Sequence, residues 1–325
     1  MLDSGRITLA QYVAETWAPS YRENLSPRTR TLYGYLYDTH VLPQLGALTL
    51  AELTPEVIAR WQADRLAAGS GPVAIRKALT LLGGILQRAV ESGHLHTNPA
   101  RLVRKAPLAR RKEVRPLAPS TVERMRAASS PRDAALISVM AYAGLRPGEA
   151  LGLQWQDIRD NTILVERAIS LGEERDTKTT THRTVRLLSP LASDLSEWKL
   201  RSGRPPGSAL VFPSHKNEPW TLPAYQSWRR RAFRRAVEAA EVSNARPYDL
   251  RHSFASLLLH EGRSVIYVAR QLGHDARLTL TTYGHVIDEL ESAPRIDAEQ
   301  AIVAARVAVN ANQRASATRP ATRMG

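Results

Sequence analysis

Two stretches, "YDLRHSFASLLLHEG" (residues 248–262) and "LGHDARLTLTTYGH" (residues 272–285), collect chemically active polar side chains at the borders of apolar helical patterns. Arg251 lies at the start of the first pattern, where the positive end of a helix dipole disfavours a cation. An anion held jointly by this guanidinium and the helix amides would explain the placement. His274 and Tyr283 follow in the second stretch, beside small polar residues. Together the two stretches predict a site for an anionic ligand.

Two earlier segments add cationic groups to this set. In "AGLRPGEALGLQW" (residues 143–155), Arg146 precedes a short helix that begins at Pro147. Glu149 lies one turn away, where both of its carboxylate oxygens could orient the guanidinium. Lys178 lies in the polar turn between two expected strands. Taken singly, each of these features is explained as well by a surface ion pair or a solvated lysine, so their joint order carries the information.

The composition is that of a globular protein. Of its residues, 43% are hydrophobic and 23% are charged. A length of 325 residues is enough for two domains with cores of their own. The chain has no cysteine, which excludes disulfides, thiolate metal ligands and cysteine nucleophiles. Apolar runs such as residues 135–145 are too short to span a bilayer, and the N-terminus has no signal-peptide pattern. We therefore expect a cytoplasmic, nucleoid-associated protein without a membrane partner.

The formal net charge of +14 predicts a polyanionic partner, and nucleic acid is the commonest polyanion in a cytoplasm. Residues 101–115 carry seven basic side chains against one acidic one, and residues 229–235 carry five basic side chains. A solvated basic loop would explain the first cluster equally well. The residues predicted to contact DNA are Arg104, Lys105, Arg110, Arg111, Lys112, Arg229, Arg230, Arg231, Arg234 and Arg235.

The pattern of elements predicts a mainly α fold with a small antiparallel β-sheet (α+β). Residues 1–100 are expected to form a domain of four or five helices, because hydroxyl residues precede prolines at Ser26–Pro27 and Thr54–Pro55, as at capped helix starts. Residues 101–117 have the composition of a basic interdomain linker.

A mixed second domain is expected over residues 118–290, opened by a helix that Ser120 and Glu123 cap. Alternating apolar residues predict two antiparallel strands, "TILVERAIS" (residues 162–170) and "TVRLL" (184–188), followed by helices. Residues 291–325 are expected to form a C-terminal helix and a flexible tail.

In its ordered motifs the chain resembles the tyrosine recombinase (phage integrase) family. The matching text is "GLRPGEALGLQW", "TKT", "DLRH", "LGH" and "TTYGH", spread over the expected second domain. The resemblance implies a helical core-binding domain that clamps duplex DNA together with a mixed catalytic domain, the basic linker crossing the duplex. It also implies a site-specific recombinase that breaks and rejoins DNA without a cofactor. Because the helical domain begins close to Met1, no further N-terminal module is expected.

The resemblance also implies a role for each site residue. The catalytic set in this numbering is Arg146, Lys178, Tyr248, Arg251, His274 and Tyr283, with Glu149 in support. Tyr283 would attack the scissile phosphate and form a 3′-phosphotyrosyl link. The two arginines would hold the non-bridging oxygens, a task that suits permanently charged planar groups. Lys178 would protonate the leaving 5′-oxygen, and His274 would donate a hydrogen bond to the phosphate or orient the nucleophile.

Tyr248 departs from the family pattern, which usually has histidine three residues before the second arginine. A neutral phenol is a poor general base at neutral pH, so slower removal of the Tyr283 proton is expected.

The remaining expectations concern assembly and class of function. The segment after Tyr283 is expected to dock on a neighbouring subunit, with a tetramer on two DNA sites, although packing on its own domain is the alternative. Accessory DNA-bending proteins could take part. A DNA-binding regulator with impaired cleavage and a type IB topoisomerase-like enzyme stay open as alternative functions.

Overall fold

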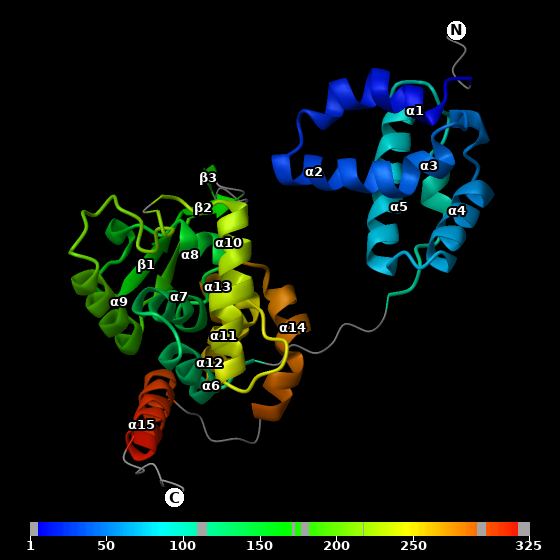
Figure 1. The fold of residues 1–325 in the computed structure, drawn as a ribbon. Helices are drawn as coiled ribbons and strands as arrows, with labels where there is room; N and C mark the ends of the chain where they lie inside the picture. Colours follow the sequence, from blue (N-terminus) through cyan, green and yellow to red (C-terminus); the bar gives the residue numbers. More distant parts are fainter. Residues whose placement is uncertain are drawn as a thin grey trace, which may run out of the picture. The chain divides into compact units, whose positions relative to one another are not determined.

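The computed structural model describes residues 6–108, 116–170, 173–176, 182–216, 218–290 and 297–317. Its contacts divide the chain into two compact units, Met1–Lys112 and Glu113–Gly325, each with a hydrophobic core of its own (Figure 1). Within the described residues the fold is mostly helical with short antiparallel strand pairs, so the predicted fold class is confirmed. None of the helices that the structure describes is long and apolar enough to cross a membrane.

The first unit is helical throughout its described part. Its elements are α1 (Leu9–Tyr12), a π-helical segment (Val13–Arg22), α2 (Pro27–Leu36), a second π-helical segment (Tyr37–Val41), α3 (Leu42–Leu45), a 3-10 turn (Leu50–Glu52), α4 (Pro55–Ala67), α5 (Pro72–Glu91) and a last 3-10 turn (Pro99–Leu102). The predicted caps are present, since the hydroxyls of Ser26 and Thr54 accept hydrogen bonds from backbone amides at the starts of α2 and α4. These bonds satisfy amides that have no partner inside the helix.

Helix α5 forms the centre of this unit because its apolar residues recur every three or four positions. Ile75, Leu79, Leu82 and Leu86 are at most 2% exposed, and this spacing places them on one face. Residues 103–106, which the sequence assigns to the linker, pack against the unit. Gln62 of α4 donates to the carbonyl of Arg104 at 2.9 Å and accepts from the amide of Ala106 at 3.0 Å.

The second unit surrounds a buried helix, α7. Its helices are α6 (Pro119–Ala127), α7 (Pro131–Tyr142), α8 (Pro147–Leu151), a 3-10 turn (Trp155–Asp157), α9 (Ser189–Arg201), α10 (Leu222–Trp228), a π-helical segment (Arg229–Phe233), α11 (Arg234–Ala239), α12 (Pro247–His260), α13 (Val265–Leu272), α14 (Ala276–Leu290) and α15 (Ala298–Ala317). Every residue from 135 to 142 is buried, and α6, α9 and α12 pack around them. This packing fixes α12, which carries Arg251.

The strands form two antiparallel pairs. β1 (Thr162–Val165) pairs with β4 (Arg183–Arg186), as the alternating pattern predicts, with Ile163 opposite Val185. β2 (Arg167–Ser170) pairs instead with β3 (Glu173–Asp176), in a stretch that the sequence assigned to a polar turn. The prediction missed β3 because its four residues, Glu-Glu-Arg-Asp, show no alternation of apolar and polar residues.

The predicted cap of α6 was wrong. α6 begins at Pro119 after Ala118, so Ser120 lies inside the helix. The side chain of Glu123 turns inward, where it accepts hydrogen bonds from the hydroxyl of Tyr142 and from Arg126. Burial of a carboxylate is tolerated here because hydrogen-bonded cations surround it.

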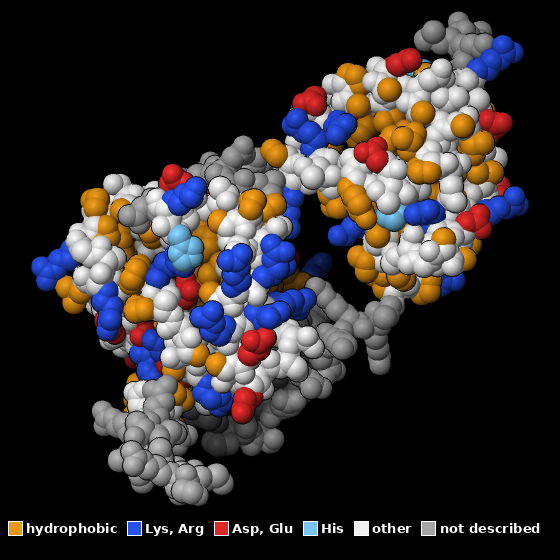
Figure 2. Space-filling model, viewed as in Figure 1, with side chains coloured by type: hydrophobic (Ala, Val, Ile, Leu, Met, Phe, Trp, Pro, Cys, Tyr) orange, Lys and Arg blue, Asp and Glu red, His pale blue; other side chains and the backbone are white. Residues whose placement is uncertain are grey.

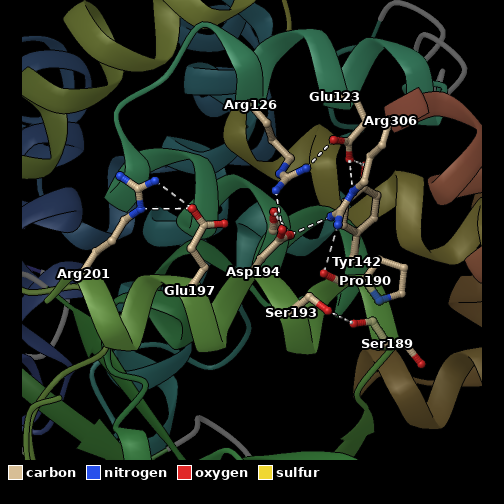
Figure 3. A network of polar contacts seen from close by, with 11 residues as sticks. Glu123, Arg126, Tyr142, Ser189, Pro190, Ser193, Asp194, Glu197, Arg201 and Arg306 are labelled. Carbon is tan, nitrogen blue, oxygen red and sulfur yellow. Dashed lines mark hydrogen bonds and ion pairs between the residues drawn. The ribbon is translucent and has the colours of Figure 1, made fainter. Parts of the chain in front are cut away.

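Helix α15 packs on its own unit, against α6 and α9. Arg306 of α15 donates to Asp194 of α9 at 2.7 Å and lies 3.4 Å from Glu123 of α6 (Figure 3). Arg126 joins the same carboxylates from the α6 side. These residues (Glu123, Arg126, Asp194 and Arg306) are called the α15 docking network below. In this structure the C-terminal helix therefore follows the alternative expectation of packing on its own domain.

Candidate active site

Glu149 lies at the centre of a cluster of arginines. Arg146, immediately before α8, donates its backbone amide to Oε2 at 2.8 Å and its Nη1 to Oε1 at 2.7 Å. The bidentate pair that the sequence suggested for Arg146 is formed instead by Arg183 of β4, at 3.0 and 2.7 Å. Nη1 of Arg251 lies 4.0 Å from the same carboxylate.

The three guanidinium groups also bind three consecutive carbonyls at the C-terminal end of α13. The pairs are Arg183 Nε to Gln271 O at 3.0 Å, Arg251 Nη2 to Leu272 O, and Arg146 Nη2 to Gly273 O at 3.0 Å. The end of a helix carries partial negative charge, which stabilises cations placed there. Gly273 takes the left-handed conformation (φ 64°) that ends α13 and presents its carbonyl to this cluster. The start of α8, strand β4 and helix α12 are thereby all attached to the end of α13.

The cluster carries more positive than negative charge. Arg146, Arg183 and Arg251 contribute three charges against one from Glu149, so two positive charges remain uncompensated within it. Burial raises the pKa of Glu149, but hydrogen bonds and charge from Arg183 and Arg146 outweigh it and bring that pKa to about 2. Burial and the two neighbouring arginines lower the pKa of Arg251 to about 10. An anion that entered the cluster would relieve this repulsion.

Arg251 is held rigidly inside the unit. It is only 1% exposed, and its Nη1 donates to the carbonyl of Gly144 at 2.5 Å. The sequence predicted this residue at the mouth of a helix facing an anion. The structure places it in the first turns of α12, with its guanidinium directed to the loop before α8 and to the end of α13.

Tyr283 lies on α14 and is 2% exposed. Its Oη lies 2.6 Å from Nδ1 of His252, which follows Arg251 on α12, and the two rings meet edge to face. Burial raises the pKa of the Tyr283 phenol, whereas the charge of Arg251 lowers it. Tyr283 therefore lies within the electrostatic influence of the arginine cluster.

His274 and Tyr248 flank this arrangement. Nδ1 of His274 lies 3.2 Å from the hydroxyl of Thr279, and burial together with the nearby guanidinium groups lowers the pKa of His274. Nδ1 of His274 also lies 3.2 Å from the carbonyl of Asp275, a contact that raises the pKa and partly offsets the lowering. Tyr248 is 43% exposed, and its ring meets that of His252 edge to face.

The structure thus brings together Arg146, Glu149, Arg251 and His274 around the end of α13, with Tyr283 on the adjacent α14. Lys178 lies outside the described residues. Arg183 was missed from the sequence, whereas His252 was noticed in the "DLRH" motif but had no role assigned to it. The sequence contained a signal for His252, because it lies four residues after Tyr248 and therefore on the same face of α12. Among the described residues no group of three potential ligands could hold a metal ion.

A basic surface follows α10. Arg229, Arg230, Arg231, Arg234 and Arg235 are all exposed, and Figure 2 shows Lys and Arg side chains gathered over the helix that runs from α10 into α11. Arg234 pairs with Glu238 in an exposed contact. In the first unit Arg104 and Lys105 are exposed as well. The other predicted contacts, Arg110, Arg111 and Lys112, lie outside the described residues.

Known proteins share this architecture. Residues 115–289 match the phage integrase family, and residues 8–64 match the N-terminal SAM-like domain of phage integrases. The putative prophage phiRv2 integrase of Mycobacterium tuberculosis H37Rv is 29% identical over 284 residues, which cover 84% of this chain and 73% of that protein. The ICEBs1 integrase of Bacillus subtilis is 25% identical over 283 residues, which cover 81% of this chain and 76% of that protein.

Solved structures share the fold. A Tn1549 transposon integrase in complex with transposon right end DNA superimposes with a TM-score of 0.73 at 19% identity, over 88% of this chain and 98% of that one. A lambda integrase tetramer bound to a Holliday junction superimposes with a TM-score of 0.65 at 18% identity, over 83% of this chain and 78% of that one. Because the family match extends over more than half of the chain and includes the arginine cluster and the buried tyrosine, the chain belongs to the phage integrase family, the tyrosine-type site-specific DNA recombinases.

Proposed function

We propose that this recombinase cleaves and rejoins double-stranded DNA through a 3′-phosphotyrosyl intermediate on Tyr283, and that it integrates or excises a mobile element. The observation that carries the proposal is the arginine cluster around Glu149, which has two uncompensated positive charges and includes Arg251, whose charge acts on the Tyr283 phenol. Phosphoryl transfer needs such charge at the non-bridging oxygens, where negative charge is held in the transition state.

The proposed chemical step uses the catalytic residues as follows. Oη of Tyr283 attacks the scissile phosphorus, the bond from phosphorus to the 5′-oxygen breaks, and the phosphate stays attached to the 3′ end. Arg146 and Arg251 neutralise the non-bridging oxygens, and the imidazole of His274 donates a hydrogen bond to one of them. Lys178 gives the proton that the leaving 5′-oxygen takes up. The new link keeps the energy of the phosphodiester, so a 5′-hydroxyl of another strand reverses the step.

Access to the phosphate requires a rearrangement. Both Tyr283 and Arg251 are nearly inaccessible in the free protein, with exposed fractions of 2% and 1%. The hydrogen bonds from Arg251 to the carbonyls of Gly144 and Leu272 must therefore loosen when DNA enters. DNA binding would supply the free energy for this change, as substrate binding does in other enzymes that assemble their site on closure.

Affinity for DNA would come from charge along both units. We propose that residues 1–100 form a core-binding domain, that residues 101–117 cross the duplex, and that residues 118–290 carry the catalytic site. The arginines between α10 and α11 are suited to phosphate contacts because their side chains are exposed. The same holds for Arg104 and Lys105. Such a protein would act in the cytoplasm, associated with the nucleoid.

The C-terminal helix would connect subunits. In the free chain α15 is held by Arg306 through the α15 docking network. We propose that α15 of one subunit occupies the same network on its neighbour within a tetramer on two DNA sites. Arginine and carboxylate groups at partly buried positions give such an interface geometric specificity. Accessory DNA-bending proteins would assist where the two sites must be brought together.

Strand exchange tests the proposal. A duplex site is first selected from a randomised pool by binding to the full chain, and two such duplexes with different end labels are then incubated with the protein. Recombinant duplexes carrying one label from each parent are the expected product. Relaxation of supercoiled plasmid without recombinants would indicate a topoisomerase. Binding with neither product would indicate a regulator, an alternative that the phenol at Tyr248 favours.

A further inference from the structure

The contact between His252 and Tyr283 has no part in the reaction described so far. The imidazole Nδ1 lies 2.6 Å from the phenol oxygen, which is a short distance for a hydrogen bond. His252 is adjacent to Arg251, so the helix that places a guanidinium in the anion cluster also fixes the imidazole against the nucleophile. The ring centroids are 5.6 Å apart and inclined at 60°, which places an edge of one ring against the other ring.

A proton acceptor is needed at this point. Tyr283 is a buried phenol, and burial disfavours its ionised form. Tyr248 occupies the position where the family usually has histidine, and its own phenol is 43% exposed and not basic at neutral pH. Imidazole is the side chain whose ordinary pKa suits it best to general base catalysis near pH 7.

We propose that His252 is the general base for Tyr283. The proposal rests on the assignment of Tyr283 as the nucleophile. In the attack the Oη–H bond breaks and an Nδ1–H bond forms on His252, while Oη bonds to phosphorus and the 5′-oxygen leaves with a proton from Lys178. When the strand is rejoined, His252 returns its proton to the phenol. This role requires the phenol to donate to Nδ1, so the proton of the neutral imidazole must be on Nε2.

Other titratable and charged groups lie near this pair. Tyr248 contacts the imidazole from the preceding turn of α12, and the arginine cluster is contributed by α8, β4 and α12. Burial raises the pKa of the Tyr283 phenol further above neutrality, and the pKa of Arg251 is about 10. Between pH 5 and 8 a change in reaction rate with pH is therefore expected to follow the protonation of imidazole groups.

Single-turnover cleavage of a nicked duplex tests the proposal. The selected site carries a nick close to the scissile phosphate, so that the short released strand diffuses away and the covalent product accumulates. His252→Asn places an amide oxygen near the position of Nδ1, so it keeps a hydrogen-bond acceptor and loses basicity. The expected rate of adduct formation is at least about 100-fold below wild type. The wild-type rate should rise with pH through the imidazole range, and this rise should be much weaker in His252→Asn.

Controls separate catalysis from folding. His260→Asn, on the last turn of α12 with its Nδ1 against the carbonyl of Ser256, should leave the rate and the pH profile unchanged. DNA affinity and thermal unfolding of His252→Asn should match wild type, and His252→Ala should be as slow as His252→Asn. A His252→Asn rate equal to wild type would overturn the proposal, as would a slower rate with the wild-type pH profile, which would assign His252 to positioning alone. If the wild type forms no adduct, the assignment of Tyr283 fails instead.

Discussion

Arg183 and Glu149 are 34 residues apart in sequence, yet the two terminal nitrogens of the guanidinium meet the two carboxylate oxygens at 3.0 and 2.7 Å. This pair connects β4 to α8, and Glu149 in turn orients Arg146. The side chain of Glu149 is 3% exposed, so its charge depends on these partners rather than on water. Stability and the arrangement of the arginine cluster are therefore linked through one carboxylate.

Stability should depend on the protonation of Glu149. Its pKa is about 2 in the folded chain against an ordinary 4.5, so its stabilising effect is present above pH 4.5 and is lost as the pH falls toward 2. Glu149→Gln removes this effect and should lower the free energy of unfolding at pH 7 by about 3 kcal/mol, measured by urea denaturation. The acid-induced loss of stability should be smaller in the variant.

Glu197→Gln provides the matched control for that substitution. Glu197 forms an exposed pair with Arg201 on α9, and such pairs contribute little in water. Equal unfolding free energies for wild type and Glu149→Gln would contradict the role given to the arginine cluster.

Arg183→Lys should slow catalysis more than it weakens DNA binding. A lysine keeps the charge but cannot form the bidentate pair or reach the carbonyl of Gln271 at the same time, so Glu149 and Arg146 would shift. A displacement of this kind can cost about 100-fold in rate, measured as single-turnover adduct formation at saturating protein. Arg186 lies on the same strand as Arg183 and pairs with Glu261. The variant Arg186→Lys should therefore react close to the wild-type rate. Equal rates for the two variants would refute a special role for Arg183.

The basic surface after α10 should contribute to salt-dependent DNA binding. Arg231→Gln with Arg235→Gln should weaken binding and reduce the slope of log affinity against log salt by about 0.9 for each phosphate that the protein no longer neutralises. Fluorescence anisotropy across a salt series measures this slope. Replacing the exposed Arg201 and Lys216 by glutamine removes the same formal charge elsewhere and should leave the slope near its wild-type value. An equal reduction in both double variants would mean that net charge alone matters.

Arg306→Ala should affect exchange between sites rather than cleavage at one. The substitution removes contacts to Asp194, Glu123 and the carbonyl of Pro190, so α15 should be cut faster in limited proteolysis. Strand exchange should fall while adduct formation on a single nicked site persists. Val307→Ala changes an exposed neighbour and is the control. Unchanged proteolysis and unchanged exchange in Arg306→Ala would argue against the proposed docking of α15 between subunits.

The sequence predicted the elements whose signals are local. The helix starts at Ser26 and Thr54 were found because a cap and a proline lie side by side in the chain. Arg146 and Arg251 were identified because their motifs are compact. The partners that complete the site were not, since the pairing of Arg183 with Glu149 arises only when β4 folds beside α8. Similarly, Glu123 satisfied a capping pattern, yet burial against Tyr142 and α15 decided its orientation.

The most direct test of the proposed chemistry is the identity of the residue that becomes attached to DNA. The full chain is incubated with the nicked selected site, the covalent product is digested, and the modified peptide is sequenced by mass spectrometry. We predict a peptide that contains Tyr283 joined to the 3′-phosphate, and no product from Tyr283→Phe. An adduct that persists in Tyr283→Phe, or one joined to another residue of the wild type, would contradict the assignment of Tyr283 as the nucleophile.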